Sequence, residues 1–527
     1  MVGRATGSQV FSREEKPWLP DKWDKEADVV IIGYGGAGAT LGLTVAEWGA
    51  KVLILEKAAF GGGNSACIAG PRFLCSTDDA KMLEYMKWMC SGQTEEDVLR
   101  AYIQRLKDIP QIYRRLGLPL ADNPQPSRID GIFPEWPAAP GAEAVRALNL
   151  LNIPGVLTAG GPILFNALAK LAEAAGVEIE YSTPAVRLVQ DANTKEVLGV
   201  IADSSGKEVA VKGRRATVLA CGGIEFNEEM CKQYITHCPI HFMGSPSLTG
   251  DGVRMAEEVG AQLWHMNSVS GPLYWSIKVD NNLVYATYER YDTPVFKNAG
   301  SIIWVNKYGN RFHNETAPML TLHHGSRNRE TWFSFDTEVA QFRNVPAFQI
   351  FDEKSRSVGP VMQVMNNTTP PWSKDNIKEI EKGWVVRADT IEDLALKCKF
   401  PFIEGVTRGG NITPRVLKTT LDRYNTNCKS GSDPDFQRKD FIVPIDTPPY
   451  YAIGPMFPTF VNTHGGPKHD AKQRVLDVNN RPIPRLYAIG ECGSLWGPYY
   501  NGCGDVSEFF TSGLIAADNV LTETTWG

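Results

Sequence analysis

The residues in this chain most suited to chemistry are three glycines and a carboxylate that follows them. Gly33, Gly35 and Gly38 have the spacing G-x-G-x-x-G, and Glu56 is the carboxylate that follows them in the chain. The first glycine allows a tight turn, the second lets the backbone approach a pyrophosphate, and the third lets a helix pack on a strand. A carboxylate in the position of Glu56 accepts hydrogen bonds from a ribose. These residues predict a dinucleotide-binding site.

The elements that must position these residues lie on either side of them. The β-branched run 29–32 is typical of a strand buried on both faces of a parallel sheet. Residues 39–48 predict the helix that the glycines open, and 51–55 predict a second strand that ends at Glu56. A pyrophosphate would lie at the positive end of that helix.

A second glycine-rich loop follows, at residues 61–70, and contains Asn64 and Ser65. Small residues at this point let the backbone lie against a flat ring. A flavin suits such a loop better than a nicotinamide does.

The chain then predicts a helix at 160–176 and a series of strands that returns to the parallel sheet. A further helix opens after Asp251, and a late strand at 485–490 leads into Glu491. This order is typical of a two-layer flavin domain with a small β-meander. The strands of the series are predicted at 177–182, 185–191, 197–204, 207–213 and 216–223.

Composition excludes several classes of protein. The net charge of -6 over 527 residues gives no basic field for nucleic acid or for an anionic membrane. Ten cysteines without a C-x-x-C pair argue against an iron–sulfur cluster or a zinc ribbon, and we expect no metal site. With no secretory segment or apolar run long enough for a bilayer, the expected location is cytoplasmic.

The domain organisation is predicted from changes in residue composition and in the pattern of expected elements along the chain. We expect an N-terminal arm at 1–26, with Trp18 and Trp23 able to pin it, and a long loop region at 118–155. The predicted fold is α/β, with the flavin domain at 27–300 and 445–527. An α+β domain is predicted as an insert at 301–444.

These residues together resemble the FAD-dependent fumarate reductase and succinate dehydrogenase flavoprotein superfamily, which also contains the 3-ketosteroid dehydrogenases. The resemblance covers 28–520 and includes five motifs in the family's order. They are GYGGAG with Glu56, GGGNSA, TGDG at 249–252, GNRFHNE at 309–315, and LYAIGECG with the glycines after it.

The resemblance implies that the cofactor is FAD and that 301–444 is a capping domain over the substrate. The AMP half would contact the glycine loop and the backbone of Val186, and the isoalloxazine would lie beside Asn64 and Glu491. The implied FAD-binding residues are Gly33, Gly35, Gly36, Ala37, Gly38, Glu56, Lys57, Gly62, Gly63, Asn64, Ser65, Val186, Cys221, Gly222, Asp251, Gly490, Glu491, Asp505 and Val506.

Two branches of the family differ in the active site. Fumarate reductases hold two carboxylates with His and Arg, and His464, Arg356 and Glu315 match their substrate histidine, proton-donating arginine and relay glutamate. However, the second relay arginine is absent from 316–318, and Tyr500 replaces the carboxylate-binding arginine. A phenol does not supply the fixed cation that a dicarboxylate needs, so fumarate is not the expected substrate.

Tyr500 to Gly504 instead has the Y-x-G-x-G form of the 3-ketosteroid Δ1-dehydrogenases. In those enzymes the tyrosine hydroxyl and the second glycine's N–H polarise the substrate ketone, as an oxyanion hole does. Their general-base tyrosine is replaced here by Pro318-Met319. The candidates for proton transfer are therefore Tyr274, Tyr499, His464 and Arg356.

The expected activity is the formation or reduction of a C=C bond conjugated to a ketone on a cyclic, apolar substrate. Electrons would pass to or from a separate carrier or a diffusible acceptor, and an oligomer is possible. Two alternatives stay open. One is an ene-reductase of an unsaturated carboxylate, which His464, Arg356 and Glu315 favour, and the other is a flavin electron-transfer subunit without a substrate of its own.

Overall fold

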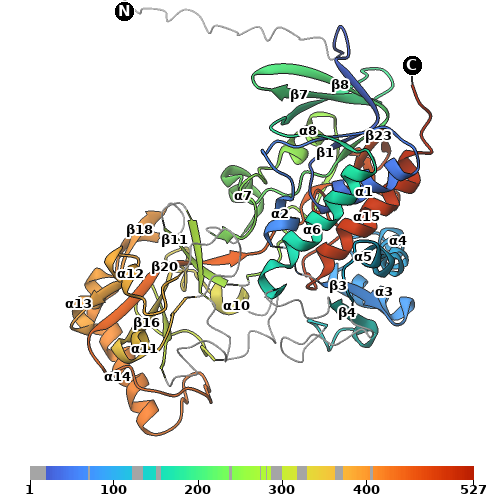
Figure 1. Ribbon diagram of the computed structural model, residues 1–527. Helices are drawn as coiled ribbons and strands as arrows, with labels where there is room; N and C mark the ends of the chain where they lie inside the picture. The colour runs from blue at the N-terminus through green and yellow to red at the C-terminus, as the bar shows by residue number, and fades with distance from the viewer. Residues whose placement is uncertain are drawn as a thin grey trace, which may run out of the picture.

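The structure is a computed structural model with two lobes (Figure 1). The larger lobe surrounds a mainly parallel sheet, and the smaller lobe surrounds a mainly antiparallel sheet. The structure describes residues 19–68, 70, 72–120, 134–149, 156–236, 240–272, 274–279, 282–286, 300–316, 329–362, 372–403 and 407–526.

The sheet of the larger lobe has eight strands: β1 (Lys25–Ile32), β2 (Val52–Leu55), β5 (Glu178–Glu180), β6 (Ala185–Gln190), β7 (Val197–Ser204), β8 (Lys207–Leu219), β22 (Arg474–Leu476) and β23 (Pro482–Ala488). The order β22-β23-β8-β1-β2-β5 is parallel from β23 to β5. The hairpin β6-β7 joins β8 in antiparallel pairing. This arrangement confirms the predicted parallel sheet with a β-meander.

Both faces of β1 are buried, as its apolar run predicts. Val29 and Ile31 pack toward α1 (Gly36–Glu47), α6 (Val156–Ala174) and α15 (Gly504–Val520), which lie together on one side of the sheet (Figure 1). Val30 and Ile32 pack on the other side, where α8 (Asp251–Glu258) contributes Met255. The alternation follows from the two-residue period of a strand.

Two elements differ from the sequence prediction. Helix α1 begins at Gly36 rather than at residue 39, so Gly38 lies in its first turn, where a Cβ would come within 2.2 Å of the Gly33 carbonyl oxygen. The strands predicted at 207–213 and 216–223 form the single strand β8. The chain stays in the sheet because β7 pairs with the first part of β8 while β1 pairs with the remainder.

The predicted loop region 118–155 is partly regular where the structure describes it. Strand β4 (Val145–Asn149) pairs with β3 (Arg72–Ser76), and 121–133 and 150–155 lie outside the described residues. The helices expected between residues 78 and 117 are α3 (Asp79–Met89), α4 (Glu96–Arg105) and α5 (Ile109–Arg115). Helix α2 (Gly63–Cys67) occupies the second glycine-rich loop.

The smaller lobe is organised by β20 (Tyr450–Phe460), which pairs with four other strands. Its sheet holds β9 (His241–Phe242), β11 (Tyr274–Val279), β12 (Asn282–Ala286), β13 (Ile303–Asn306), β16 (Ala347–Asp352), β17 (Val386–Ala388) and β20. This sheet reaches beyond the predicted limits 301–444, because β9, β11, β12 and β20 lie outside them. We call this lobe the cap.

The remaining elements cover these sheets or connect them. In the cap they are α10 (Arg329–Trp332), α11 (Glu353–Ser357), α12 (Ile377–Glu381), α13 (Ile391–Lys397), α14 (Pro414–Lys429), β14 (Phe335–Asp336), β15 (Gln341–Phe342), β18 (Lys399–Ile403) and β19 (Thr407–Asn411). Elsewhere they are α7 (Glu228–Tyr234), β10 (Leu263–Trp264), β21 (Gly466–Pro467) and the short 3-10 helices at 106–108 and 142–144.

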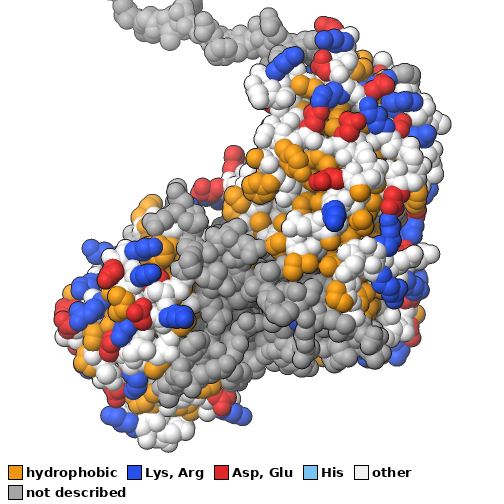
Figure 2. Space-filling model, in the orientation of Figure 1, with side chains coloured by type: hydrophobic (Ala, Val, Ile, Leu, Met, Phe, Trp, Pro, Cys, Tyr) orange, Lys and Arg blue, Asp and Glu red, His pale blue; other side chains and the backbone are white. Residues whose placement is uncertain are grey.

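The surface differs between the lobes. In Figure 2, hydrophobic side chains gather on the larger lobe where α2 and α6 lie in Figure 1, whereas charged side chains cover the outer end of the cap. Trp23 packs edge-on against Trp526, while Trp18 lies outside the described residues. In the described part of the chain, no helix is both long and apolar enough to cross a membrane.

Candidate FAD and active site

The glycine loop lies between β1 and α1, with Glu56 beside it. The Tyr34 N–H donates to Glu56 Oε2 (2.9 Å), and the Ala58 N–H donates to Glu56 Oε1 (2.8 Å). These bonds fix the carboxylate at the carboxyl edge of the sheet, where dinucleotides bind in such folds. Gly33 is required by the fold, since its φ is +105° and a Cβ would meet the Ala220 carbonyl oxygen at 2.5 Å.

Gly35 differs from Gly33, because a side chain here would not clash with the protein. A Cβ at Gly35 would lie in ordinary contact with the Gly62 carbonyl oxygen (3.7 Å) and Ser65 Oγ (3.8 Å). Packing therefore does not require this glycine, whereas the close approach of a pyrophosphate would. The neighbouring Gly36 N–H donates to Ser65 Oγ (2.9 Å), which joins the two glycine-rich loops.

Asn64 connects the second glycine-rich loop to the far end of the chain. Its Nδ2 lies 3.0 Å from both carboxyl oxygens of Glu491, and its Oδ1 accepts from the Ser245 N–H (3.0 Å). The structure thus brings together two of the residues predicted to border the isoalloxazine.

Lys57 and Asp251 form another pair among the predicted FAD-binding residues. The Lys57 Nζ lies 2.6 Å from Asp251 Oδ2 and 2.6 Å from Thr249 Oγ1. Asp251 is the first residue of α8, where a carboxylate interacts favourably with the helix dipole. Both side chains keep partial exposure, so the pair is open to solvent or to a ligand.

The other predicted FAD-binding residues lie around the same edge of the sheet. Gly62 pairs with Gly35 in an isolated β-bridge, and Gly63 opens α2. Cys221 and Gly222 lie after the end of β8, with Ala220 between. The Val186 carbonyl accepts from Arg254 (3.0 Å). The remaining residues are in α1 (Ala37), after β23 (Gly490) and in the first turn of α15 (Val506).

His464 lies among buried polar groups at the start of α15. Its side chain is fully buried, and neither ring nitrogen has a hydrogen-bond partner. Its Nε2 is 3.6 Å from Asp505 Oδ1, an oxygen that is also buried without a partner. Asn462 Nδ2 donates a hydrogen bond to the other carboxyl oxygen of Asp505, Oδ2 (2.7 Å). Because buried polar groups are normally satisfied, these atoms point to a missing partner.

Tyr500 lies against His464, with ring centroids 5.1 Å apart. Its hydroxyl accepts from the Asp505 N–H (3.0 Å), and burial followed by the Asp505 charge raises the Tyr500 pKa well above its usual range. The phenol is therefore neutral. The Gly504 N–H donates to the Asn501 carbonyl (3.0 Å), so this expected ketone donor is already bonded within the chain.

Sequence reasoning missed two further buried acids. Glu225 follows the double glycine after β8, and its Oε1 accepts from the Thr463 N–H (2.8 Å). Burial, followed by the charge of Glu225 and then that of Asp505, raises the pKa of Glu491 well above its usual range. A carboxylate at the carboxyl edge of a parallel sheet was the available signal for Glu225.

Glu508 is the second missed acid, on α15. Ser494 Oγ (2.6 Å) and the Leu495 N–H (2.8 Å) donate to its carboxyl group. Burial and then Asp505 raise the pKa of Glu508 to about 8.

Glu225, Glu491 and Asp505 are three carboxyl groups that we call the site acids. Among the described residues, no lysine or arginine lies within ion-pair distance of any of them.

Three other proton-transfer candidates are placed differently. Arg356 is on α11 and donates to Glu353 (2.8 and 2.5 Å) and to the Asp375 carbonyl (2.8 Å), so its contacts are within the cap. Tyr499 stacks on Trp88 with ring centroids 5.6 Å apart. Tyr274 begins β11 and pairs with Thr459, and its side chain lies outside the described atoms, as do Pro318 and Met319.

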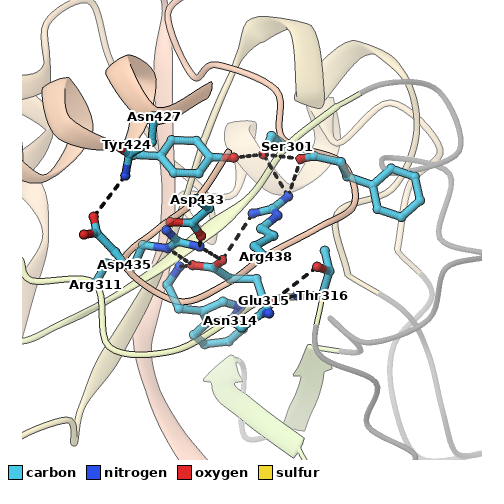
Figure 3. A network of polar contacts seen from close by, with 12 residues as sticks. Ser301, Arg311, Asn314, Glu315, Thr316, Tyr424, Asn427, Asp433, Asp435 and Arg438 are labelled. Carbon is cyan, nitrogen blue, oxygen red and sulfur yellow. Dashed lines mark hydrogen bonds and ion pairs between the residues drawn. The ribbon is translucent and has the colours of Figure 1, made fainter. Parts of the chain in front are cut away.

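Glu315, the matched relay glutamate, lies in a buried ion cluster of the cap (Figure 3). Arg311 donates to both of its oxygens (2.7 and 2.5 Å), and Arg438 Nη1 is 3.2 Å from Oε2. Burial raises the Glu315 pKa, but the two guanidinium groups outweigh that effect and hold it below its usual range. Arg311 also pairs with Asp433 (2.7 Å). We call these four residues the cap cluster.

The residues present fit FAD on the evidence of this structure. The Gly35 backbone, where packing does not require a glycine, and the fixed carboxylate of Glu56 suit the pyrophosphate and a ribose. The buried atoms of His464 and Asp505 that lack partners leave hydrogen-bonding capacity for a bound molecule. Among the described residues, no cluster of side chains suits a metal ion.

Comparison with known proteins agrees with this geometry. Residues 28–506 match the family model described as FAD binding domain. The chain is 25% identical over 544 residues to the digoxin reductase of Eggerthella lenta, a match that covers 96% of this chain and 88% of that protein. It is 26% identical over 592 residues to a 3-oxosteroid 1-dehydrogenase of Mycobacterium tuberculosis (95% and 99% covered).

A solved structure shows the same fold. The crystal structure of 3-ketosteroid delta1-dehydrogenase from Sterolibacterium denitrificans, in complex with 1,4-androstadiene-3,17-dione, superposes with a TM-score of 0.71 at 24% identity, over 94% of this chain and all of that one. The chain therefore belongs to the FAD binding domain family of fumarate reductase and succinate dehydrogenase flavoproteins, and it is an FAD-dependent oxidoreductase of the kind that acts on CH–CH bonds.

Proposed function

We propose that this enzyme forms or reduces a C=C bond conjugated to a ketone on a cyclic, apolar substrate. The observation that carries the proposal is the composition of the buried site. Tyr500 and His464 lie beside Asp505, and no described lysine or arginine lies within ion-pair distance of the site acids. Such a site disfavours a dicarboxylate, whereas a neutral ketone needs only a hydrogen-bond donor.

The Tyr500 hydroxyl supplies that donor. The oxygen of this hydroxyl accepts from the Asp505 N–H, and we assign its proton to the ketone oxygen of a bound substrate. A donor fixed in this way stabilises the negative charge that grows on the oxygen when the adjacent C–H bond breaks. Bound FAD supplies the acceptor or donor of the hydride.

His464 and Asp505 are suited to move the proton of the reaction. Their facing atoms are 3.6 Å apart and buried without other partners, so a substrate proton taken by the imidazole would be stabilised by the carboxylate. We assign to this pair the proton transfer for which the sequence left four candidates, one of which is His464. The names of the relatives, which include a 3-oxosteroid dehydrogenase, support a ketone substrate.

The test is anaerobic mixing of the oxidised FAD-bound enzyme with saturated cyclic ketones, and of the reduced enzyme with cyclic enones. We expect the flavin absorbance to change within single turnovers for ketones or enones, and to stay constant with succinate or fumarate. Reaction with the dicarboxylates alone would select the carboxylate ene-reductase. Reaction with no member of either panel would select an electron-transfer subunit. A quinone or dye added afterwards identifies the class of electron acceptor.

A further inference from the structure

The residues on either side of Tyr500 are held by the same two segments of the chain. One segment is α3, which contributes Tyr85 and Trp88, and the other is residues 135–136. Tyr85 and Trp88 are three positions apart, so they lie on the same face of the helix. Neither segment belongs to the five motifs of the family resemblance, and both are far from Tyr500 in the sequence.

Asn501, the residue after Tyr500, is fully buried. Its Oδ1 accepts from the Tyr85 hydroxyl (2.6 Å) and from the Glu135 N–H (3.2 Å), and its Nδ2 donates to the Gly502 carbonyl (3.0 Å). Burial, followed by the charge of Glu135, raises the pKa of Tyr85 well above its usual range, so this hydroxyl is protonated and donates. An amide with buried partners on both of its ends is fixed in one orientation.

Glu135 also holds the next residue of the same turn. Its carboxyl group is buried, and its Oε1 accepts from the Gly502 N–H (2.7 Å). The backbone and the side chain of Glu135 thus bind two successive residues, Asn501 and Gly502.

The turn 501–504 in its own structure leads back to the phenol. The Asn501 carbonyl accepts from the Gly504 N–H (3.0 Å), and the next N–H, that of Asp505, donates to the Tyr500 hydroxyl (3.0 Å). The hydrogen bond that orients the phenol therefore depends on the conformation of this turn.

Tyr499, the residue before Tyr500, is held by aromatic contacts from the same two segments. Its ring stacks on Trp88 at an interplanar angle of 20°, with centroids 5.6 Å apart, and the Trp136 ring lies 5.4 Å from it. Trp88 and Trp136 are themselves in contact (5.5 Å). Each segment therefore supplies a polar contact to Asn501 and an aromatic contact to Tyr499.

We propose that Tyr85, Glu135 and Asn501 are positioning residues for Tyr500. They fix the turn 501–504, and through it they keep the phenol in the orientation in which it donates to a ketone oxygen. The proposal rests on the proposed function of Tyr500. A donor that is already oriented needs no rearrangement when charge develops on the substrate, whereas a small displacement of it slows the reaction.

Removal of one hydroxyl is the mildest test. Tyr85→Phe keeps the ring and deletes a donor to Asn501, so it should slow the single-turnover reduction of bound FAD by a saturated cyclic ketone by about 10-fold. The ketone concentration at half-saturation should stay near that of the wild type. Tyr113→Phe, on α5, is the matched control, because its buried hydroxyl has no hydrogen-bond partner among the described residues and its loss should leave the rate unchanged.

Two substitutions of Glu135 separate its hydrogen bond from its charge. Glu135→Gln keeps an oxygen that accepts from the Gly502 N–H and should retain most of the rate, whereas Glu135→Ala should slow flavin reduction by about 10²-fold. An equal loss in both variants would mean that the charge of Glu135 matters and not its bond to the turn, and would overturn the proposal.

A double-mutant cycle shows whether the effect passes through Tyr500. Tyr85→Phe should slow the wild-type enzyme and should have no further effect on Tyr500→Phe. Losses that multiply would mean that Tyr85 acts independently of Tyr500, which would contradict the positioning role.

Hydrogen exchange decides the proposal even if no ketone of the panel reacts. In the FAD-bound protein, the amides of Gly502, Gly504 and Asp505 should exchange faster in Tyr85→Phe and in Glu135→Ala than in the wild type. Unchanged exchange would overturn the proposal. Faster exchange together with a normal rate of flavin reduction in Tyr500→Phe would refute the proposed function of Tyr500 and leave the hold on the turn in place.

Discussion

Two buried groups of charged side chains differ in how their charges are balanced. In the cap cluster, Glu315 pairs with Arg311 and Arg438, and Asp433 pairs with Arg311 (Figure 3). The site acids have no lysine or arginine within ion-pair distance among the described residues, so no such cation balances their charge. The difference indicates that the first group holds the cap together, whereas the second is completed by molecules from outside the chain.

The pKa directions make the same distinction. The pKa of Glu315 is lowered, so its contribution to stability is present above the usual glutamate range and is lost as the pH falls through the folded pKa. The pKa values of Glu491 and Glu508 are raised, so their contribution is present at low pH and is lost as the pH rises. A fall in pH should therefore destabilise the cap, whereas a rise in pH should destabilise the larger lobe.

The largest expected effect comes from breaking the cap cluster. Glu315→Ala leaves Arg311 and Arg438 buried without their counter-ion and should lower the free energy of unfolding by about 3–5 kcal/mol, measured by urea denaturation. Arg423→Ala, which removes an exposed partner of Asp435, should cost less than about 1 kcal/mol. Equal losses in the two variants would show that burial adds nothing to the contribution of the cap cluster.

A smaller effect is expected at the glycine loop. Glu56→Gln weakens an acceptor that two backbone N–H groups and a ribose share, so FAD affinity should fall by about 1.5–3 kcal/mol, measured by titration of the apo protein. Glu180→Gln, at the end of β5 and paired with Lys25, is the matched control and should bind FAD normally. Full FAD affinity in Glu56→Gln would count against the ribose role.

The last effect is a dependence on pH, and it is the smallest when it is counted per pH unit. Between the usual glutamate pKa of 4.5 and the Glu508 value of about 8, this residue alone should make stability fall by at most about 1.4 kcal/mol per pH unit. Glu508→Gln should make the melting temperature less dependent on pH in this interval. An unchanged slope would show that Glu508 is ionised in the folded protein.

The sequence predicted the larger lobe well because its signals are local. The apolar run of β1, the glycines that open α1 and the position of Glu56 depend on neighbours in the chain, and the structure confirms the parallel sheet with its meander. The resemblance implied that Asn64 and Glu491 both border the isoalloxazine, and in the structure the Asn64 Nδ2 lies 3.0 Å from both carboxyl oxygens of Glu491.

The cap and the acid site were harder to predict because tertiary contacts decide them. Nothing near Glu315 indicates that Arg438, far along the chain, closes its ion pair. The same is true of Glu225 and Thr463, which belong to different segments. The Gly504 N–H donates to the Asn501 carbonyl in the turn before α15, and the motif Y-x-G-x-G does not specify that hydrogen bond.

The central claim is that Tyr500 and His464, beside the site acids, perform the reaction, whereas the cap cluster stabilises the fold. Two tyrosine substitutions test it, because Tyr424 belongs to the network around the cap cluster and its hydroxyl bonds to Ser301 (2.6 Å). The measurement is the rate of flavin reduction by a reactive cyclic ketone in single-turnover stopped flow, with FAD content checked first. Tyr500→Phe should slow this step by about 10²–10³-fold, and Tyr424→Phe should leave it unchanged. A normal rate in Tyr500→Phe, or an equal loss in both variants, would contradict the account.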